Sequence, residues 1–266
     1  MLDNILEVRD LKVYFPIKKG VFSRTTGYVK AVDGVSFDLR RGETLGVVGE
    51  SGCGKSTTSR SILMLNKPCG GTISFNGQDI GKLKGQALLD YHRRVQVVFQ
   101  DPAAALNPRH TIREILSEGA IYHGLIQKED AYDFAAHLLE QVGLPAAMLD
   151  RYPHEFSGGQ RQRICIARAI ALKPELLICD EAVSALDLSI RAQVLDLLAD
   201  LKAKLGLSFL FITHDIGVVQ HIADRIIVMN KGRIVEAGTC DEVLKHPQEE
   251  YTRYLMASVP KIGKPL

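Results

Sequence analysis

The order of apolar and polar positions predicts a sheet of buried strands separated by helices. Residues 35–39 alternate between apolar and polar side chains, which predicts an antiparallel strand with one face in water. Mainly apolar runs, which are typical of strands buried on both faces, occur at residues 44–48, 95–99, 176–179 and 209–213, with Gln96 as an interruption in the second. Helices are expected at residues 55–65, 160–172 and 191–205. This order predicts an α/β fold around a parallel sheet.

Other segments extend this core. Residues 5–15 partly alternate and predict a strand that Pro16 ends. From 112 to 142 the apolar positions recur at helical spacing, which indicates an inserted helical lobe. A closing hairpin is expected over 226–236, and a helical tail over 241–257.

Composition narrows the function. The 266 residues carry a net charge of +2, which gives no case for nucleic-acid binding. No apolar run approaches the roughly 20 residues that span a bilayer, and the first residues lack a secretion signal. The five cysteines form no C-x-x-C pair, as expected for reduced thiols. We therefore expect a cytoplasmic protein whose membrane role, if it has one, comes through a partner.

The first candidate site is a glycine-rich loop between a predicted strand and a predicted helix. Residues 49–56 match the pattern G-x-x-x-x-G-K-[ST]. In such loops the backbone N–H groups and the helix N-terminus surround phosphates. Lys55 is expected to reach the β- and γ-phosphates, and the Ser56 hydroxyl to bind Mg²⁺. The predicted ATP-binding residues here are Gly49, Ser51, Gly52, Cys53, Gly54, Lys55, Ser56 and Thr57.

A second candidate is the pair of acids that ends the apolar run at 176–179. In parallel sheets, ligands bind beyond the carboxyl ends of the strands. Asp180 is therefore expected to hold Mg²⁺. Glu181 is expected to polarise the attacking water as a general base.

Residues 156–160 decide between families. They read Phe-Ser-Gly-Gly-Gln and resemble the L-S-G-G-Q signature of ABC transporter nucleotide-binding domains, with Phe156 in place of Leu. The phosphate loop alone leaves GTPases, kinases and helicases open, and the signature removes them. The resemblance covers residues 6–260 and implies an ATPase. It also implies a P-loop NTPase (RecA-like) core with an antiparallel β subdomain and an inserted helical subdomain.

The resemblance and the pattern together predict the domain bounds. Residues 1–100 and 160–245 would form the nucleotide-binding core with its antiparallel β subdomain. Residues 101–159 would form the helical lobe with the signature, and residues 246–266 a C-terminal tail.

The resemblance assigns roles to further residues. Gln100 matches the glutamine that links Mg²⁺ to the membrane partner, and His214 the histidine that contacts the γ-phosphate. Residues 184–187 match the D-loop, which ends in Asp187. Phe15, with Tyr14 as second choice, matches the aromatic residue that stacks on adenine, and core packing is the alternative role.

The family signature implies that the chain works in a dimer. Two such domains pack head to tail, so that Ser157 and Gly158 of one subunit close over the ATP of the other. Gly159 and Gln160 complete the signature. The implied partners are a second ABC ATPase subunit, two membrane permease subunits and, indirectly, an extracytoplasmic solute-binding protein. The implied location is the cytoplasmic face of the bacterial inner membrane, where the chain would be a peripheral subunit.

Two stretches resemble the peptide and nickel importer branch of the family. These are residues 99–109 and the tail at 246–255, which matches H-P-x-x-x-Y-T-x-x-L. The long first loop at 15–29 and the short tail resemble the second of two different ATPase subunits, which predicts a heterodimer. Ala182 replaces a commoner proline and leaves the solute open.

The sequence leaves more than one possibility for the transported solute and for the class of ABC ATPase. Peptides rank first because they are the broadest solute class of the branch, and nickel, metallophores and glutathione stay open. A soluble ABC ATPase that acts on DNA or ribosomes typically has two such domains or a coiled-coil insertion. An exporter usually carries fused membrane helices. The sequence favours neither of these.

Overall fold

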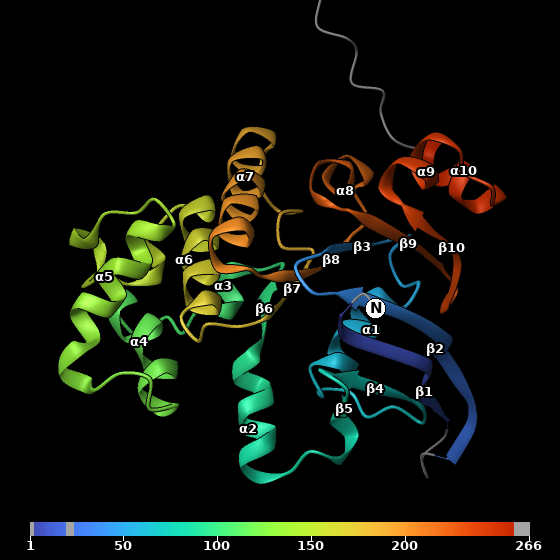
Figure 1. Ribbon diagram of the computed structural model, residues 1–266, viewed down its shortest axis with the longest axis horizontal. Helices are drawn as coiled ribbons and strands as arrows, with labels where there is room; N and C mark the ends of the chain where they lie inside the picture. The colour runs from blue at the N-terminus through green and yellow to red at the C-terminus, as the bar shows by residue number, and fades with distance from the viewer. Residues whose placement is uncertain (1–2, 20–23, 258–266) are drawn as a thin grey trace, which may run out of the picture. The chain divides into compact units, whose positions relative to one another are not determined.

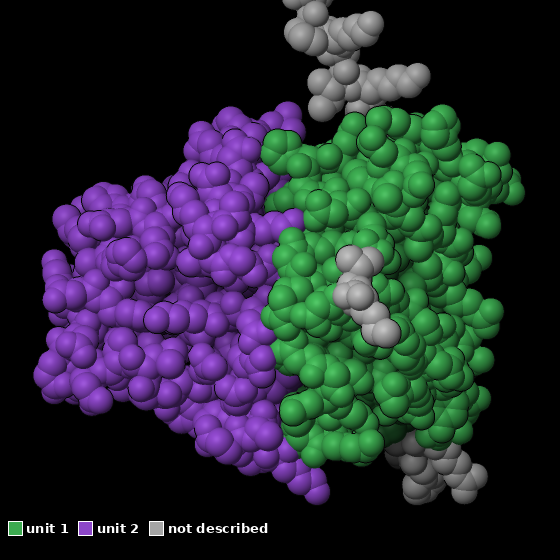
Figure 2. All heavy atoms as spheres, in the orientation of Figure 1, with its two compact units in different colours: residues 1–83, 210–266 green, residues 84–209 purple. Residues whose placement is uncertain are grey.

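The computed structural model describes residues 3–19 and 24–257. The chain forms two compact units (Figure 2). The first unit comprises Met1–Leu83 and Leu210–Leu266, and the second comprises Lys84–Phe209. The predicted long loop at 15–29 and the predicted tail at 246–266 extend into residues 20–23 and 258–266, which lie outside the described residues.

An antiparallel sheet of order β2-β1-β4-β5 forms one part of the first unit (Figure 1). Its strands are β1 (Asn4–Lys19), β2 (Arg24–Arg40), β4 (Gly70–Phe75) and β5 (Gln78–Asp79). Val35, Phe37 and Leu39 of β2 are buried, whereas Ser36 between them is exposed. This alternation confirms the strand predicted at 35–39 and places one of its faces in the core.

The prediction that Pro16 ends the first strand is wrong. β1 continues to Lys19 and pairs with β2 along its whole length. Its pairing with β4 reaches only from Leu6 to Lys12. Among the described strands, β1 at Pro16 therefore has a neighbour on one side only, and an open edge accommodates a residue that lacks a backbone N–H. The segment predicted as a long loop is thus largely a long hairpin.

The second sheet segment of the first unit has the order β10-β9-β3-β8. Its strands are β3 (Thr44–Val48), β8 (Ser208–Thr213), β9 (Arg225–Asn230) and β10 (Arg233–Thr239), and the chain passes between the units within β8. β9 and β10 form the predicted hairpin, and every residue of β3 and β8 is buried, as their apolar runs predict. The helices are α1 (Lys55–Ile62), η1 (Ile80–Lys82), α8 (Ile216–Ile222), α9 (Cys240–Lys245) and α10 (Glu250–Ala257).

The second unit combines two strands with a helical lobe. β6 (Val95–Phe99) and β7 (Leu176–Asp180) are parallel neighbours. The longer helices are α2 (Gly85–Arg94), α4 (Ile112–Tyr122), α5 (Ala131–Gln141), α6 (Gly158–Ile170) and α7 (Leu188–Leu205). The short ones are α3 (Pro102–Ala105), η2 (Lys128–Asp130), η3 (Ala146–Met148) and η4 (Pro153–Glu155). α4, α5 and α6 pack together, in agreement with the helical pattern at 112–142 (Figure 1).

Across residues 3–19 and 24–257, no helix combines the length and the apolar character needed to cross a membrane.

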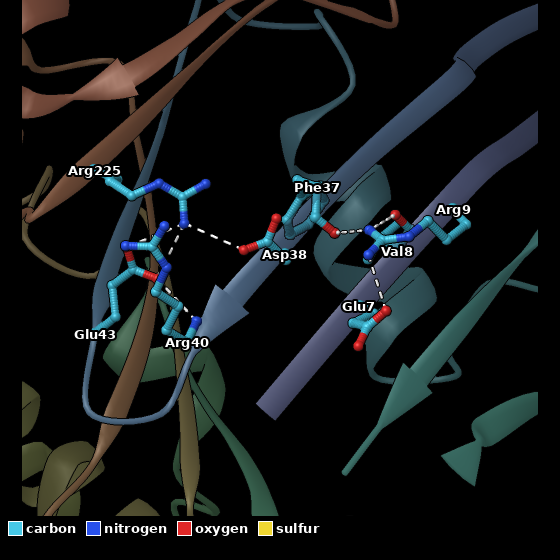
Figure 3. A network of polar contacts seen from close by, with 8 residues as sticks. All are labelled: Glu7, Val8, Arg9, Phe37, Asp38, Arg40, Glu43 and Arg225. Atoms are coloured by element: carbon cyan, nitrogen blue, oxygen red, sulfur yellow. Dashed lines mark hydrogen bonds and ion pairs between the residues drawn. The ribbon is translucent and has the colours of Figure 1, made fainter. Parts of the chain in front are cut away.

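An arginine on β9 connects the two sheet segments of the first unit (Figure 3). The Nη1 atom of Arg225 lies 3.2 Å from Oε1 of Glu43 and 3.4 Å from Oδ2 of Asp38. The Glu43 carboxylate also accepts a hydrogen bond from the backbone N–H of Arg40 at 2.8 Å. Since only 7% of the Glu43 side chain is exposed, its charge depends on these partners.

Replacing Arg225 is therefore expected to destabilise the first unit. Arg225→Met leaves the Glu43 carboxylate with one backbone donor and should cost about 1–3 kcal/mol. The thermal unfolding midpoint, measured by differential scanning fluorimetry, should fall by roughly 3–8 °C.

The matched control is Lys245→Met, which breaks the exposed pair between Lys245 and Asp241, 2.9 Å apart. An exposed pair of this kind contributes less than about 1 kcal/mol, so the midpoint should hardly move. Equal shifts in the two variants would contradict the role given to Arg225.

Candidate nucleotide-binding site

The predicted phosphate loop occupies residues 49–54, between β3 and α1. A Cβ atom at Gly49 would lie 2.2 Å from the Met229 carbonyl oxygen, and one at Gly54 would lie 2.3 Å from the Ala31 carbonyl oxygen. Gly54 also has a φ of 109° where it precedes α1. Both positions therefore require glycine, and the loop lies directly against the backbones of β9 and β2.

The remaining loop residues differ in exposure. Ser51 and Gly52 are exposed, Cys53 is buried, and Ser56 and Thr57 are half-buried in the first turn of α1. The exposed backbone at the tip of the loop and the start of α1 is where a phosphate is predicted to bind.

Lys55 is turned back onto this loop. The residue is only 4% exposed. Its ammonium donates to the carbonyl oxygens of Gly49, at 2.7 Å, and Glu50, at 2.8 Å. A phosphate oxygen is a stronger acceptor for an ammonium than a neutral carbonyl oxygen. The side chain is therefore held where an arriving phosphate can replace its partners.

The turn between β9 and β10 forms backbone hydrogen bonds that connect it to the phosphate loop and to β2. The Gly232 N–H donates to the Cys53 carbonyl oxygen at 2.9 Å, and the Gly232 carbonyl oxygen accepts from the Asp33 N–H at 2.8 Å. The sequence predicts the hairpin but not these contacts, because no periodic pattern relates positions so far apart in the chain.

The two candidate aromatic residues differ in their partners. The Tyr14 hydroxyl donates to Oδ1 of Asp33 at 2.5 Å, and the Lys30 ammonium lies 5.3 Å from the Tyr14 ring centroid. Hydrogen bonds from Tyr14 and Arg233 lower the pKa of Asp33 to about 2, and the same carboxylate raises the pKa of Tyr14 to about 12. Phe15, by contrast, is 43% exposed. This difference favours Phe15 over Tyr14 for adenine stacking, which stays a prediction.

His214 lies between β8 and α8 in the same unit and is exposed. The following residue, Asp215, accepts hydrogen bonds from the backbone N–H groups of Gly217 at 2.9 Å and Val218 at 3.4 Å. This N-cap fixes the direction of the chain directly after the histidine.

In the second unit, the strand register brings two predicted residues together. β6 and β7 are parallel, with Phe99 opposite Asp180. Gln100 and Glu181 therefore leave adjacent strands at the same edge of the sheet. Asp180 is buried, with 6% exposure, whereas Gln100 is exposed.

Glu181 has an unusual backbone conformation. Its φ is 53°, in the left-handed region that non-glycine residues rarely adopt. Its carbonyl oxygen accepts from the Ser184 N–H at 3.1 Å and from the Ser184 hydroxyl at 2.8 Å, which closes the turn. Such conformations cost of order 1–3 kcal/mol and cluster at functional sites. The turn thus fixes the position of this acid directly after β7.

The predicted signature forms the start of α6. Oγ of Ser157 accepts from the Gln160 N–H at 3.3 Å, and Oε1 of Gln160 accepts from the Ser157 N–H at 3.0 Å. This reciprocal pair is a capping box. A Cβ atom at Gly159 would lie 2.6 Å from Cγ2 of Ile190, whereas one at Gly158 would meet nothing within 4 Å. Close packing on α7 thus explains Gly159 but not Gly158.

The predicted D-loop residue caps the neighbouring helix. Asp187 accepts from the Ile190 N–H and from the Ser189 hydroxyl, both at 3.0 Å. These bonds lower the pKa of Asp187. Because Ile190 also contacts Gly159, the start of α7 and the signature lie side by side.

Comparison with known proteins agrees with these motifs. The ABC transporter family model matches residues 32–184. The oligopeptide transport ATP-binding protein AppF of Bacillus subtilis is 52% identical over 98% of this chain and 80% of its own length. The dipeptide transport ATP-binding protein DppF of Escherichia coli is 49% identical over 97% of this chain and 77% of its own length.

A longer relative is the glutathione import ATP-binding protein GsiA of Pectobacterium atrosepticum. It is 51% identical over 97% of this chain, which spans only 41% of that relative.

Solved structures give the same result. The structure of cbiO1 from Clostridium perfringens, part of an ABC transporter complex, superposes with a TM-score of 0.78 at 27% identity and covers 98% of this chain and 97% of its own. The ATP-binding cassette MJ0796, determined as a dimer with ADP and phosphate, gives a TM-score of 0.77 at 27% identity over 88% of this chain and 98% of its own.

The fold and the phosphate loop define a P-loop ATPase. The chain belongs to the ABC transporter family and is an ATP-binding, ATP-hydrolysing subunit.

The cysteine in the phosphate loop provides a test of the nucleotide site. Cys53 is 6% exposed, and its burial raises the pKa of the thiol, although Lys55 opposes this shift. The thiol is therefore protonated at neutral pH, and only the thiolate reacts. Iodoacetamide should modify Cys53 more slowly than the exposed Cys69, and the rate at Cys53 should increase with pH as its thiol ionises. ATP should slow the reaction further.

Peptide mapping by mass spectrometry would follow each cysteine separately, and the Cys53→Ser variant would lack the reactive group. Complete modification of Cys53 should abolish ATP binding. Unchanged ATP binding after complete modification would show that the thiol points away from the nucleotide.

Proposed function

We propose that this chain is the ATP-hydrolysing motor subunit of an ABC importer that takes up peptides. The observation that supports this most is its identity of 52% and 49% with oligopeptide and dipeptide transport ATP-binding proteins over nearly the whole chain. Glutathione, named for a third relative, is itself a small peptide. The chemistry of ATP cleavage would be common to all these solutes.

Each predicted site residue would have a separate role in ATP hydrolysis. The N–H groups of the phosphate loop and the Lys55 ammonium would bind the β- and γ-phosphates. Glu181 would accept a proton from the attacking water as general base. His214 would contact the γ-phosphate, and Gln100 would connect the site to the membrane partner. Phe15 would stack on adenine.

The donor types also fit Mg²⁺. Ser56, Gln100 and Asp180 offer hydroxyl, amide and carboxylate oxygens, which Mg²⁺ prefers to nitrogen or sulfur. In the parts of the chain that are described, no cluster of three or more His, Cys, Asp or Glu side chains could hold a metal ion. When bound with ATP, Mg²⁺ would neutralise charge on the phosphates.

The signature is suited to an ATP held by another subunit. Gly158 lies at the N-terminus of α6, where backbone N–H groups attract anions. The space beside Gly158 is open, since an added Cβ would meet nothing within 4 Å. Ser157 and Gly158 would close over the γ-phosphate of the partner's ATP, so that ATP joins two subunits and hydrolysis releases them.

The remaining assignments complete this proposal. The partners would be a second, different ATPase subunit, two membrane permease subunits and an extracytoplasmic solute-binding protein, with the chain peripheral on the cytoplasmic face of the membrane. Residues 101–159 would form the helical lobe with the signature, and the surface that contacts the permeases would lie between Gln100 and this lobe. Residues 1–100 and 160–245 would form the nucleotide-binding core, with 246–266 as the tail.

The direct test is ATP hydrolysis by the co-purified membrane complex, with its binding protein empty, peptide-loaded or nickel-loaded. A peptide importer should be stimulated by the peptide-loaded protein alone, because a loaded binding protein favours closure of the ATPase dimer. Stimulation by the metal-loaded form alone would replace the proposal with a nickel importer. If neither loaded form stimulated hydrolysis, the assignment as an ATPase would stand, but the proposal that the solute is a peptide would be contradicted.

The matched control is the same complex with Glu181→Gln. The variant keeps the shape of the side chain and loses the base, so hydrolysis should fall about a hundredfold or more while ATP binding is retained. Wild-type turnover in this variant would contradict the role of Glu181 without bearing on the solute.

A further inference from the structure

The C-terminal helix reaches the phosphate loop. The hydroxyl oxygen of Tyr251 on α10 accepts a hydrogen bond from the backbone N–H of Glu50 at 3.2 Å. Both residues belong to the first unit. Tyr251 is the tyrosine of the H-P-x-x-x-Y-T-x-x-L tail, for which the sequence alone indicates no physical role.

α10 is anchored before and along its length. The Glu236 carboxylate on β10 accepts hydrogen bonds from the backbone N–H groups of Gln248 at 2.8 Å and Glu249 at 3.2 Å, directly before the helix begins. Tyr251 and Leu255, one helical turn apart, pack against a buried cluster that contains Val48. Since Val48 is the last residue of β3, the tyrosine ring is fixed beside the start of the loop.

Tyr251 and Lys55 both bind the peptide group between Gly49 and Glu50. The carbonyl of the peptide between Gly49 and Glu50 accepts from the Lys55 ammonium at 2.7 Å, and its N–H donates to Tyr251. When Lys55 turns toward a phosphate, the carbonyl loses its charged donor. The bond to Tyr251 is then a contact that keeps this peptide from rotating.

We propose that Tyr251 is a positioning residue of the nucleotide site, which fixes the orientation of the 49–50 peptide and so strengthens ATP binding. The tail would thereby stabilise the loop in the conformation that binds ATP. This role of Tyr251 rests on the proposed nucleotide site but not on the peptide solute. The role of Tyr251 and the identity of the solute can therefore be tested separately.

The test removes only the hydroxyl. Tyr251→Phe, made in the full chain, keeps the ring that packs on the buried cluster. The Kd for ATP should rise about three- to tenfold, the effect of losing one hydrogen bond. Backbone amide exchange at Glu50, followed by NMR, should become faster, while exchange along β10 and the thermal midpoint stay unchanged.

The matched control is Tyr254→Phe, the same chemical change on the same helix at a residue that is 60% exposed. It should leave both the Kd and the exchange at Glu50 unchanged. An unaltered Kd in Tyr251→Phe would overturn the proposal. A weaker Kd accompanied by a lower midpoint and faster exchange throughout β10 would also overturn it, because the hydroxyl would then serve stability and not positioning.

Discussion

The nucleotide site depends on how closely the phosphate loop approaches the backbones beside it. At Gly49 and Gly54 a single added carbon would overlap carbonyl oxygens of β9 and β2. The loop is therefore fixed by backbone contacts, and its polar groups are oriented before any ligand arrives. The Lys55 ammonium is hydrogen-bonded to two carbonyl oxygens of the same loop. Preorganised groups of this kind bind a charged ligand without the cost of ordering them afterwards.

Four strands, of which β6 is only partly buried, end at a predicted functional residue or segment. In the first unit, β3 leads into the phosphate loop and β8 leads to His214. In the second unit, β6 leads to Gln100 and β7 to Asp180 and Glu181. The carboxyl ends of parallel strands are where α/β proteins bind ligands. Helix N-caps fix further site residues, since Ser157 and Asp187 are predicted site residues that cap α6 and α7, and Asp215, which follows His214, caps α8.

Local patterns in the sequence predict much of this arrangement. The buried strands β3, β7 and β8 follow from continuous apolar runs, and the phosphate loop follows from its spacing between a strand and a helix. Contacts between distant segments leave no such pattern, which is why Tyr251 and Gly232 were not predicted at the phosphate loop. α2 was not predicted because its apolar positions are few, and Tyr91 is its only buried residue. Pro16 was misread because an open strand edge is a property of the sheet and not of the sequence.

The most direct test of the account is ATP binding by Lys55→Ala, measured by calorimetry beside wild-type protein and a Lys82→Ala control, whose lysine side chain is 84% exposed. If the loop at 49–57 is the nucleotide site, Lys55→Ala should bind ATP about 10–100-fold more weakly, because charge-assisted bonds to phosphate are lost, and Lys82→Ala should bind as wild type does. Wild-type affinity in Lys55→Ala would contradict the assignment of the site.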